Sequence, residues 1–249
     1  GSAVTQAISH LGDAFGVVGV WPAAWVACER VLSLCSEPRR QARSRQGLDE
    51  PRWAREAQAL GSAPPLRVLE IGCGVGLPSL CALAAGGEVL ATDLERLPLL
   101  LLEAAAEAQQ LPGSLETATL DVLEAADQSA RPTNGVRRPT CASPSDSSRF
   151  DIIVCSDCLY KVDVAAAIGR LLARALLKYP TTKLVVTDAE RRGRQAFLDA
   201  LAEGLSLGPR TGTPLPYFDV TKVPHWAREE AVDPFDGTPR DSVGLLKLF

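Results

Sequence analysis

The chain has 249 residues, of which 46% are hydrophobic and 22% charged, a balance that fits one globular domain with a sizeable core. Its formal net charge of -4 provides no overall basic field, which argues against nucleic acid as a partner. No apolar run reaches the ~20 residues that a membrane-spanning helix needs, so we expect no membrane location.

Cysteine usage indicates a reducing compartment. The seven cysteines are odd in number and several lie in apolar segments, as expected of free buried thiols rather than of a disulfide framework. We therefore expect a cytoplasmic protein, with the nucleus as the alternative. Cys155 and Cys158 form a C-x-x-C, but a zinc site needs two more ligands and the chain has only two histidines and no second such pair. We expect both thiols to pack as small hydrophobic groups, with a redox pair as the alternative.

A helical lead-in is predicted for residues 1–60. Pro22 suits the first turn of a helix. The residues that follow it form an apolar stripe at helical spacing: Ala23, Ala24, Ala27, Val31 and Leu34. The next segment, Ser36–Pro65, is rich in Arg, Pro, Gln and Ser. Because acidic residues dilute its charge, we interpret it as a solvated loop or surface helix rather than as a nucleic-acid patch.

A glycine loop follows at residues 67–76, which read R-V-L-E-I-G-C-G-V-G. The apolar run predicts a buried parallel strand, and the glycines after it allow a sharp turn and a close approach of the backbone to a ligand. A helix is predicted for Ser79–Ala85, ending at Gly86 and Gly87. Strand, glycine loop and helix together predict a nucleotide-type site at the carboxyl edge of a sheet, with a turn that binds nothing as the alternative.

The spacing of the glycines differs from the dinucleotide fingerprint. That fingerprint is G-x-G-x-x-G, whereas here the third glycine comes one residue early and Glu70 stands two residues before the first. A second strand, Glu88–Thr92, is followed by Asp93, which could accept hydrogen bonds from both hydroxyls of a ribose.

The rest of the chain alternates between strands and helices and then ends in two strands. Helices are predicted at Leu97–Gln110, Val162–Lys178 and Arg191–Leu205, and strands at Leu115–Leu120, Phe150–Ser156, Lys183–Thr187, Tyr217–Val223 and Ser242–Phe249. The alternation predicts an α/β fold with a parallel sheet covered by helices on both faces, and the last pair would add an antiparallel edge. Residues 125–149, rich in Pro and Ser, are predicted to be a flexible insertion.

Four segments, in order, resemble methyltransferase family 16, a group of seven-β-strand S-adenosylmethionine-dependent enzymes. They are Val20-Trp21-Pro22-Ala23-Ala24, the glycine loop Leu69–Gly76, Asp93, and the D-x-x-Y sequence within Ser156–Tyr160. The family contains eukaryotic protein lysine methyltransferases, related bacterial enzymes and a histidine methyltransferase. The resemblance covers residues 17–206 and implies one methyltransferase domain over residues 1–249, with a Rossmann-like, doubly wound sheet of seven strands, mostly parallel with an antiparallel final strand.

The resemblance also implies the cofactor and the site. S-adenosyl-L-methionine would be held by Trp21, Glu70, Gly72, Cys73, Gly74, Gly76, Asp93, Leu94, Asp121, Val122 and Ser156. Many members carry a Trp against the adenine where this chain has Val122, whose aliphatic side chain can still pack on the ring. The insertion at 125–149 is a second departure from the family pattern.

Asp157 and Tyr160 are the catalytic residues that the resemblance implies. A free lysine is almost entirely protonated at neutral pH, and a carboxylate beside it raises its pKa further. Asp157 would therefore capture and orient the incoming cation rather than deprotonate it, and Tyr160 would shape the channel. The structural alternative for Asp157 is an N-cap of the helix that starts at Val162.

One competing class is argued against by the sequence. Amino-methyltransferases of nucleic acids and of glutamine carry N/D-P-P-Y/F/W at this strand end, and this chain has no proline there. Histidine and small-molecule N-methyltransferases share the fold, and a non-catalytic cofactor-binding protein is a further alternative. The expected partner is a protein substrate, methylated on lysine by a monomeric enzyme.

Overall fold

The computed structural model describes residues 20–45, 64–127, 150–206, 225–232 and 239–247. The first half contains α2 (Pro22–Arg45), β1 (Arg67–Ile71), α4 (Leu77–Ala84), β2 (Glu88–Asp93), α5 (Arg96–Ala108), β3 (Ser114–Thr119) and α6 (Val122–Ala126). The second half contains β4 (Ile152–Ser156), α7 (Val162–Lys178), β5 (Lys183–Asp188), α8 (Arg194–Ser206), β6 (His225–Val232) and β7 (Pro239–Lys247).

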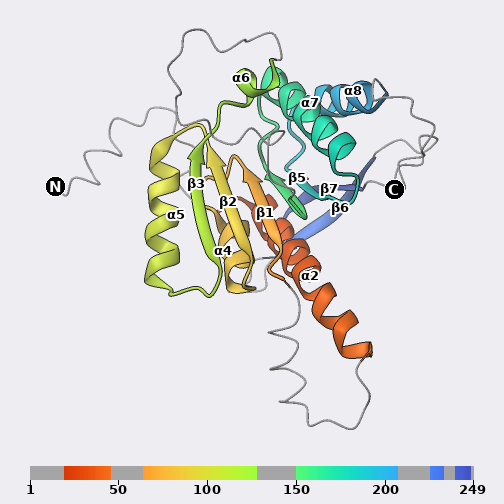
Figure 1. The fold of residues 1–249 in the computed structure, drawn as a ribbon. Helices are drawn as coiled ribbons and strands as arrows, with labels where there is room; N and C mark the ends of the chain where they lie inside the picture. Colours follow the sequence, from red (N-terminus) through yellow and green to blue (C-terminus); the bar gives the residue numbers. More distant parts are fainter. Residues whose placement is uncertain (1–19, 46–63, 128–149, 207–224, 233–238, 248–249) are drawn as a thin grey trace, which may run out of the picture.

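The described strands form one seven-stranded sheet in the order β3-β2-β1-β4-β5-β7-β6 (Figure 1). The pairs from β3 to β5 are parallel, and β7 runs antiparallel to both of its neighbours. The predicted Rossmann-like, doubly wound sheet with an antiparallel final strand is confirmed. The chain leaves β1 in one direction and returns to β4 on its other side, so the topological switch point lies between these two strands.

The core has two layers because successive residues of a strand face opposite sides of the sheet. In β4, Ile152 and Val154 pack with residues of α2, α4 and α5, whereas Ile153 and Cys155 pack with residues of α7 and α8. Helices therefore cover both faces, and α7 and α8 lie together on one of them (Figure 1).

Helix α2 starts at Pro22 as predicted but continues beyond Leu34 to Arg45. Four of the five residues of its predicted stripe are buried; Ala24 is half-buried. The Thr187 hydroxyl of β5 donates a hydrogen bond to the carbonyl of Ala23 (2.9 Å), which fixes the start of the helix at the carboxyl edge of the sheet.

Several predictions about the position of elements are wrong, among them the start of β7, which is Pro239 rather than Ser242. Ala125 and Ala126 belong to α6, a short helix that the sequence did not predict, so the insertion cannot start at 125. Helix α8 begins at Arg194 rather than Arg191. The partner of β7 is β6, not the predicted Tyr217–Val223. That segment and residues 128–149 of the predicted insertion lie outside the described residues. Among the described helices, none combines the length and the hydrophobicity of a membrane span.

Candidate active site

The glycine loop joins β1 to α4 at the carboxyl edge of the sheet. Gly72, Gly74 and Gly76 have φ angles of 66°, 52° and 71°, in the left-handed region that favours glycine. A Cβ on Gly72 would lie 2.7 Å from the Sγ of Cys158. The intervening Cys73 is buried, and its backbone N–H donates to a carbonyl of β2 2.9 Å away. The loop therefore turns tightly beside the switch point.

Glu70 supports this loop from behind. Its side chain faces α4 and is 1% exposed. Its Oε2 accepts hydrogen bonds from the backbone N–H of Ser79 (3.0 Å) and from the Ser79 hydroxyl (2.5 Å). Burial raises the pKa of Glu70 to about 8. Because the carboxyl group is directed at α4, the predicted cofactor contact of this residue would have to come from its backbone.

Asp93, at the end of β2, is brought to the glycine loop. Its Oδ2 accepts the N–H of Gly74 (2.9 Å) and its Oδ1 accepts the N–H of Glu95 (3.1 Å). A carboxylate has about four acceptor positions, so each oxygen can still accept one more hydrogen bond. The adjacent Leu94 is 61% exposed and stands at the rim.

Asp121 follows β3 and caps the short helix α6. Its Oδ1 accepts the N–H groups of Leu123 (2.8 Å) and Glu124 (3.3 Å). Val122 is half-buried and packs against the core. The two residues fix α6 at the same edge as the glycine loop, and their contact with an adenine stays a prediction.

The loop after β4 is tethered to the glycine loop by Cys158. The thiol lies 3.3 Å from the carbonyl oxygen of Ile71 and 3.2 Å from that of Ser156. Cys155 and Cys158 are both buried in the core, which confirms their predicted packing as small hydrophobic groups. The Ser156 hydroxyl lies 3.1 Å from that of Thr187. The Cys158 thiol thus links the loop after β4 to the start of the glycine loop.

Asp157 is held by an arginine that we did not predict as part of the site. Its Oδ1 accepts Arg191 Nε (3.1 Å) and its Oδ2 accepts Arg191 Nη2 (2.8 Å), a bidentate ion pair. The N–H of Ala189 adds a third bond, at 3.3 Å. The Asp157 side chain is only 6% exposed, and its φ is 54°. The alternative of an N-cap is wrong, because Lys161 occupies that position of α7 without a side-chain cap.

Trp21 lies against this pair at the surface. The guanidinium carbon of Arg191 lies 5.7 Å from the centre of the Trp21 ring, within the range of a cation–π contact. Trp21 is 39% exposed, so it is not a core tryptophan. Tyr160 is 58% exposed. The structure thus joins Trp21 to Asp157 through Arg191 and leaves Tyr160 open to solvent.

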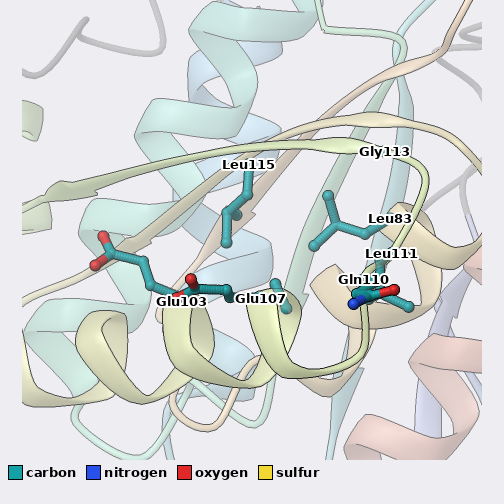
Figure 2. Close-up of a pocket in the computed structure, with 8 residues that line it drawn as sticks. Leu83, Glu103, Glu107, Gln110, Leu111, Gly113 and Leu115 are labelled. Atoms are coloured by element: carbon teal, nitrogen blue, oxygen red, sulfur yellow. The ribbon is translucent and has the colours of Figure 1, made fainter.

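A pocket of about 330 Å³ lies elsewhere, between α5 and the start of β3 (Figure 2). Leu83, Leu111 and Leu115 line its apolar part, and Glu103 and Glu107 stand at its side (Figure 2). It lies at the amino edge of the sheet, opposite the glycine loop, and it contains none of the predicted site residues.

The carboxyl edge fits a nucleoside cofactor. The positive φ angles of the glycines bring backbone close to any ligand that lies over β1, and Asp93 keeps acceptor positions that suit a ribose diol. Among the described residues, no group of three or more His, Cys, Asp or Glu could hold a metal ion. The fold and this edge together have the arrangement of a nucleotide-type site at a topological switch point.

Comparison with known proteins assigns the family. The model of the family described as "Lysine methyltransferase" matches residues 8–204, and the chain belongs to this family, which uses S-adenosylmethionine. A search of curated proteins found no match.

Solved structures of methyltransferases share the fold. An S-adenosylmethionine-dependent methyltransferase from Agrobacterium tumefaciens has 18% identity and a TM-score of 0.50 over 92% of this chain and 61% of its own. A TehB-like methyltransferase from Corynebacterium glutamicum has 18% identity and a TM-score of 0.41, over 88% of this chain and 97% of its own. PKMT2 from Rickettsia typhi, solved with AdoHcy, has 24% identity and a TM-score of 0.35, over 51% and 22%.

Proposed function

We propose that this chain transfers a methyl group from S-adenosylmethionine to the side-chain nitrogen of a lysine in a protein substrate. The observation that carries the proposal is the placement of D-x-x-Y directly beside the glycine loop, fastened to it by the Cys158 thiol. Membership in the lysine methyltransferase family supports the same substrate class.

The cofactor would be surrounded by the glycine loop, with contacts to Gly72, Cys73, Gly74 and Gly76. Asp93 would accept hydrogen bonds from the ribose hydroxyls. The sides of the cofactor site would be lined by Leu94, Val122 and Ser156. When bound, S-adenosylmethionine supplies an electrophilic methyl group. The chain itself must align the acceptor nitrogen with that methyl group and exclude water. Asp157 and Tyr160 lie at the end of β4, next to β1, where the acceptor would approach.

The acceptor must lose its proton before it can react. A free lysine has a pKa of about 10.4, so a neutral amine at pH 7.4 is about 4 kcal/mol less favourable than the ammonium form. No carboxylate can lower that barrier by charge, since a negative neighbour favours the ammonium ion. We assign Asp157 to orienting the nitrogen and Tyr160 to shaping the entrance, and the proton leaves to solvent.

The expected setting is the cytoplasm, with the nucleus as the alternative, and a monomeric enzyme. The described thiols of Cys28, Cys73, Cys81, Cys155 and Cys158 are free, in keeping with a reducing compartment.

The test is methyl labelling of a methyl-depleted cell extract with tritiated S-adenosylmethionine and the purified chain. We expect a labelled band that resists nuclease and is destroyed by protease. Label confined to RNA or to small molecules would contradict the proposal. Label on a protein histidine would keep the family and replace the acceptor.

A further inference from the structure

Arg191 is fixed at three points. Its backbone N–H donates to Oδ2 of Asp188 (2.8 Å). Its guanidinium donates two hydrogen bonds to Asp157, and the same group lies over the Trp21 ring. The loop that carries it is held to the loop after β4 by the N–H of Gly193, which donates to the carbonyl of Leu159 (3.0 Å). An arginine restrained in this way is part of a built site rather than a solvated surface group.

The pair changes what Asp157 presents to an acceptor. Both carboxylate oxygens are engaged by the cation, and the hydrogen bonds to Asp157 raise the pKa of Arg191 above its usual value. The carboxylate and the guanidinium carry opposite charges in direct contact, so the ion pair is neutral as a unit. Oδ2 accepts one hydrogen bond from Arg191, and a carboxylate oxygen has a second acceptor position that can receive an N–H.

The surrounding charges leave this neutrality intact. Asp188 is fully buried, and its Oδ2 is paired with Arg194 Nε (2.7 Å). Glu190 lies 3.9 Å from Arg194 Nη1 at the surface. The carboxylate of Asp93 is hydrogen-bonded to the glycine loop. The ammonium group of Lys161 lies over the ring of Tyr160. Asp163 follows at the start of α7. Arg191 is the described cation in direct contact with Asp157.

We propose that Arg191 is a positioning residue for methyl transfer: it fixes Asp157 and cancels its charge, so that the acceptor lysine is received as a neutral amine. This inference rests on the proposed function. It replaces the capture of a cation by Asp157 with the acceptance of one amine N–H by a neutral pair. An unpaired carboxylate would favour the unreactive ammonium ion, whereas a neutral pair orients the lone pair of the amine without that bias.

In the competing interpretation, the substrate displaces Arg191 from Asp157 and binds the carboxylate in its place. The three restraints argue against it. Expelling the guanidinium would break a bidentate pair on a carboxylate that is 6% exposed and would remove the stacking on Trp21. A permanent pair is the arrangement that these contacts favour.

The first experiment compares pH profiles of labelling in the methyl-depleted extract. The variants are Arg191→Gln, which removes the charge, Arg191→Lys, which keeps it, and Arg192→Gln, the exposed neighbour, as the control. For Arg191→Gln we expect the rise of the rate with pH to move about one unit to higher pH, because the bare carboxylate stabilises the ammonium form. The profile of Arg191→Lys should be shifted less, because the positive charge is kept. The profile of Arg192→Gln should coincide with that of the wild type.

The second experiment does not depend on activity. Calorimetry with S-adenosylhomocysteine should give affinities within about threefold of the wild type for Arg191→Gln. In a thermal double-mutant cycle, Asp157→Asn and Arg191→Gln should each lower the melting temperature, and together by less than the sum, because either single change already removes the ion pair.

The outcomes separate the two proposals. A wild-type chain that labels no protein contradicts the proposed function. A wild-type chain that labels protein, together with an Arg191→Gln profile that is unshifted or lowered equally at every pH, contradicts the role of Arg191 alone. Additive melting temperatures would show that the pair itself is not formed in solution.

Discussion

Glu70 shows how one buried carboxyl can hold a cofactor loop. It is fully enclosed and reaches Ser79 of α4 with hydrogen bonds to the backbone and the hydroxyl. Burial opposes ionisation more strongly than these bonds favour it, and the pKa of Glu70 rises from 4.5 to about 8. The glycine loop therefore depends on a group whose charge state changes near neutral pH.

This makes stability depend on pH at one residue. Because the pKa is raised in the folded state, the stabilisation is full below about pH 4.5 and is lost as the pH rises through 8. We expect the wild type to lose on the order of 2–4 kcal/mol relative to Glu70→Gln between about pH 5 and 8. Urea unfolding at several pH values measures it, with the exposed Glu107→Gln as control. A constant difference between wild type and Glu70→Gln would contradict the account.

The sequence predicted that the glycine loop and Asp93 lie together, but it did not predict the partner of Asp157. Gly72, Gly74 and Asp93 were identified by spacing alone, and the structure joins the loop to Asp93 by a hydrogen bond. Arg191 was missed because the helix was expected to begin at this residue, whereas α8 begins three residues later. The available signal was an arginine just after β5, beside the acid at the end of β4, since neighbouring parallel strands end together.

At the scale of elements, α2 is the part that brings a distant segment to the site. Trp21 immediately precedes this helix, and the buried Thr187 hydroxyl of β5 holds its first turn through the Ala23 carbonyl. The same hydroxyl lies next to Ser156 at the end of β4. Thr187 thus connects α2, β4 and β5 at one point.

Thr187→Val removes that connection with little change in volume. We expect a loss of about 1 kcal/mol in the free energy of unfolding, together with a fall in labelling activity as Trp21 loses its fixed position. Thr182→Val is the matched control, since its hydroxyl bonds the Phe150 carbonyl (2.7 Å) at the other end of β4. Urea unfolding and extract labelling measure both. Equal losses of activity in the two variants would contradict a specific role of the α2 contact.

The alternating elements were predictable because continuous apolar runs and helical stripes describe them fully. Helix α7, Val162–Lys178, has the predicted bounds. Strand β6, H-W-A-R-E-E-A-V, was missed because its apolar residues form two separated pairs, which neither alternate nor make a continuous run, and because it owes its position to pairing with β7. Helix α6 is a single short element capped by Asp121, below the length at which periodicity can be recognised.

For the whole molecule, cofactor binding should be visible as stabilisation. S-adenosylhomocysteine at about one hundred times its Kd should add about 2.7 kcal/mol, or roughly 5–10 °C in melting temperature. Asp93→Ala should reduce the shift to below about 2 °C, because the ribose acceptor and the Gly74 bond are lost. Asp199→Ala on the exposed side of α8 is the control. A full shift in Asp93→Ala would place the cofactor elsewhere.

The architecture places the site at the switch point of the sheet. The sheet places the cofactor loop and the D-x-x-Y loop on either side of the switch point, and this arrangement serves many methyl acceptors. At this edge the chain also places the Asp157–Arg191 ion pair against Trp21. Such a pair suits an amine that must react without its proton.

The most direct test of the proposed protein-lysine methylation is to identify the residue that carries the methyl group. Tandem mass spectrometry of the labelled extract protein should locate the added methyl on a lysine side-chain nitrogen. Asp157→Asn should abolish this modification while calorimetry shows S-adenosylhomocysteine affinity within about threefold of the wild type. A methyl group on any other acceptor, or equal lysine methylation by Asp157→Asn, would contradict the account.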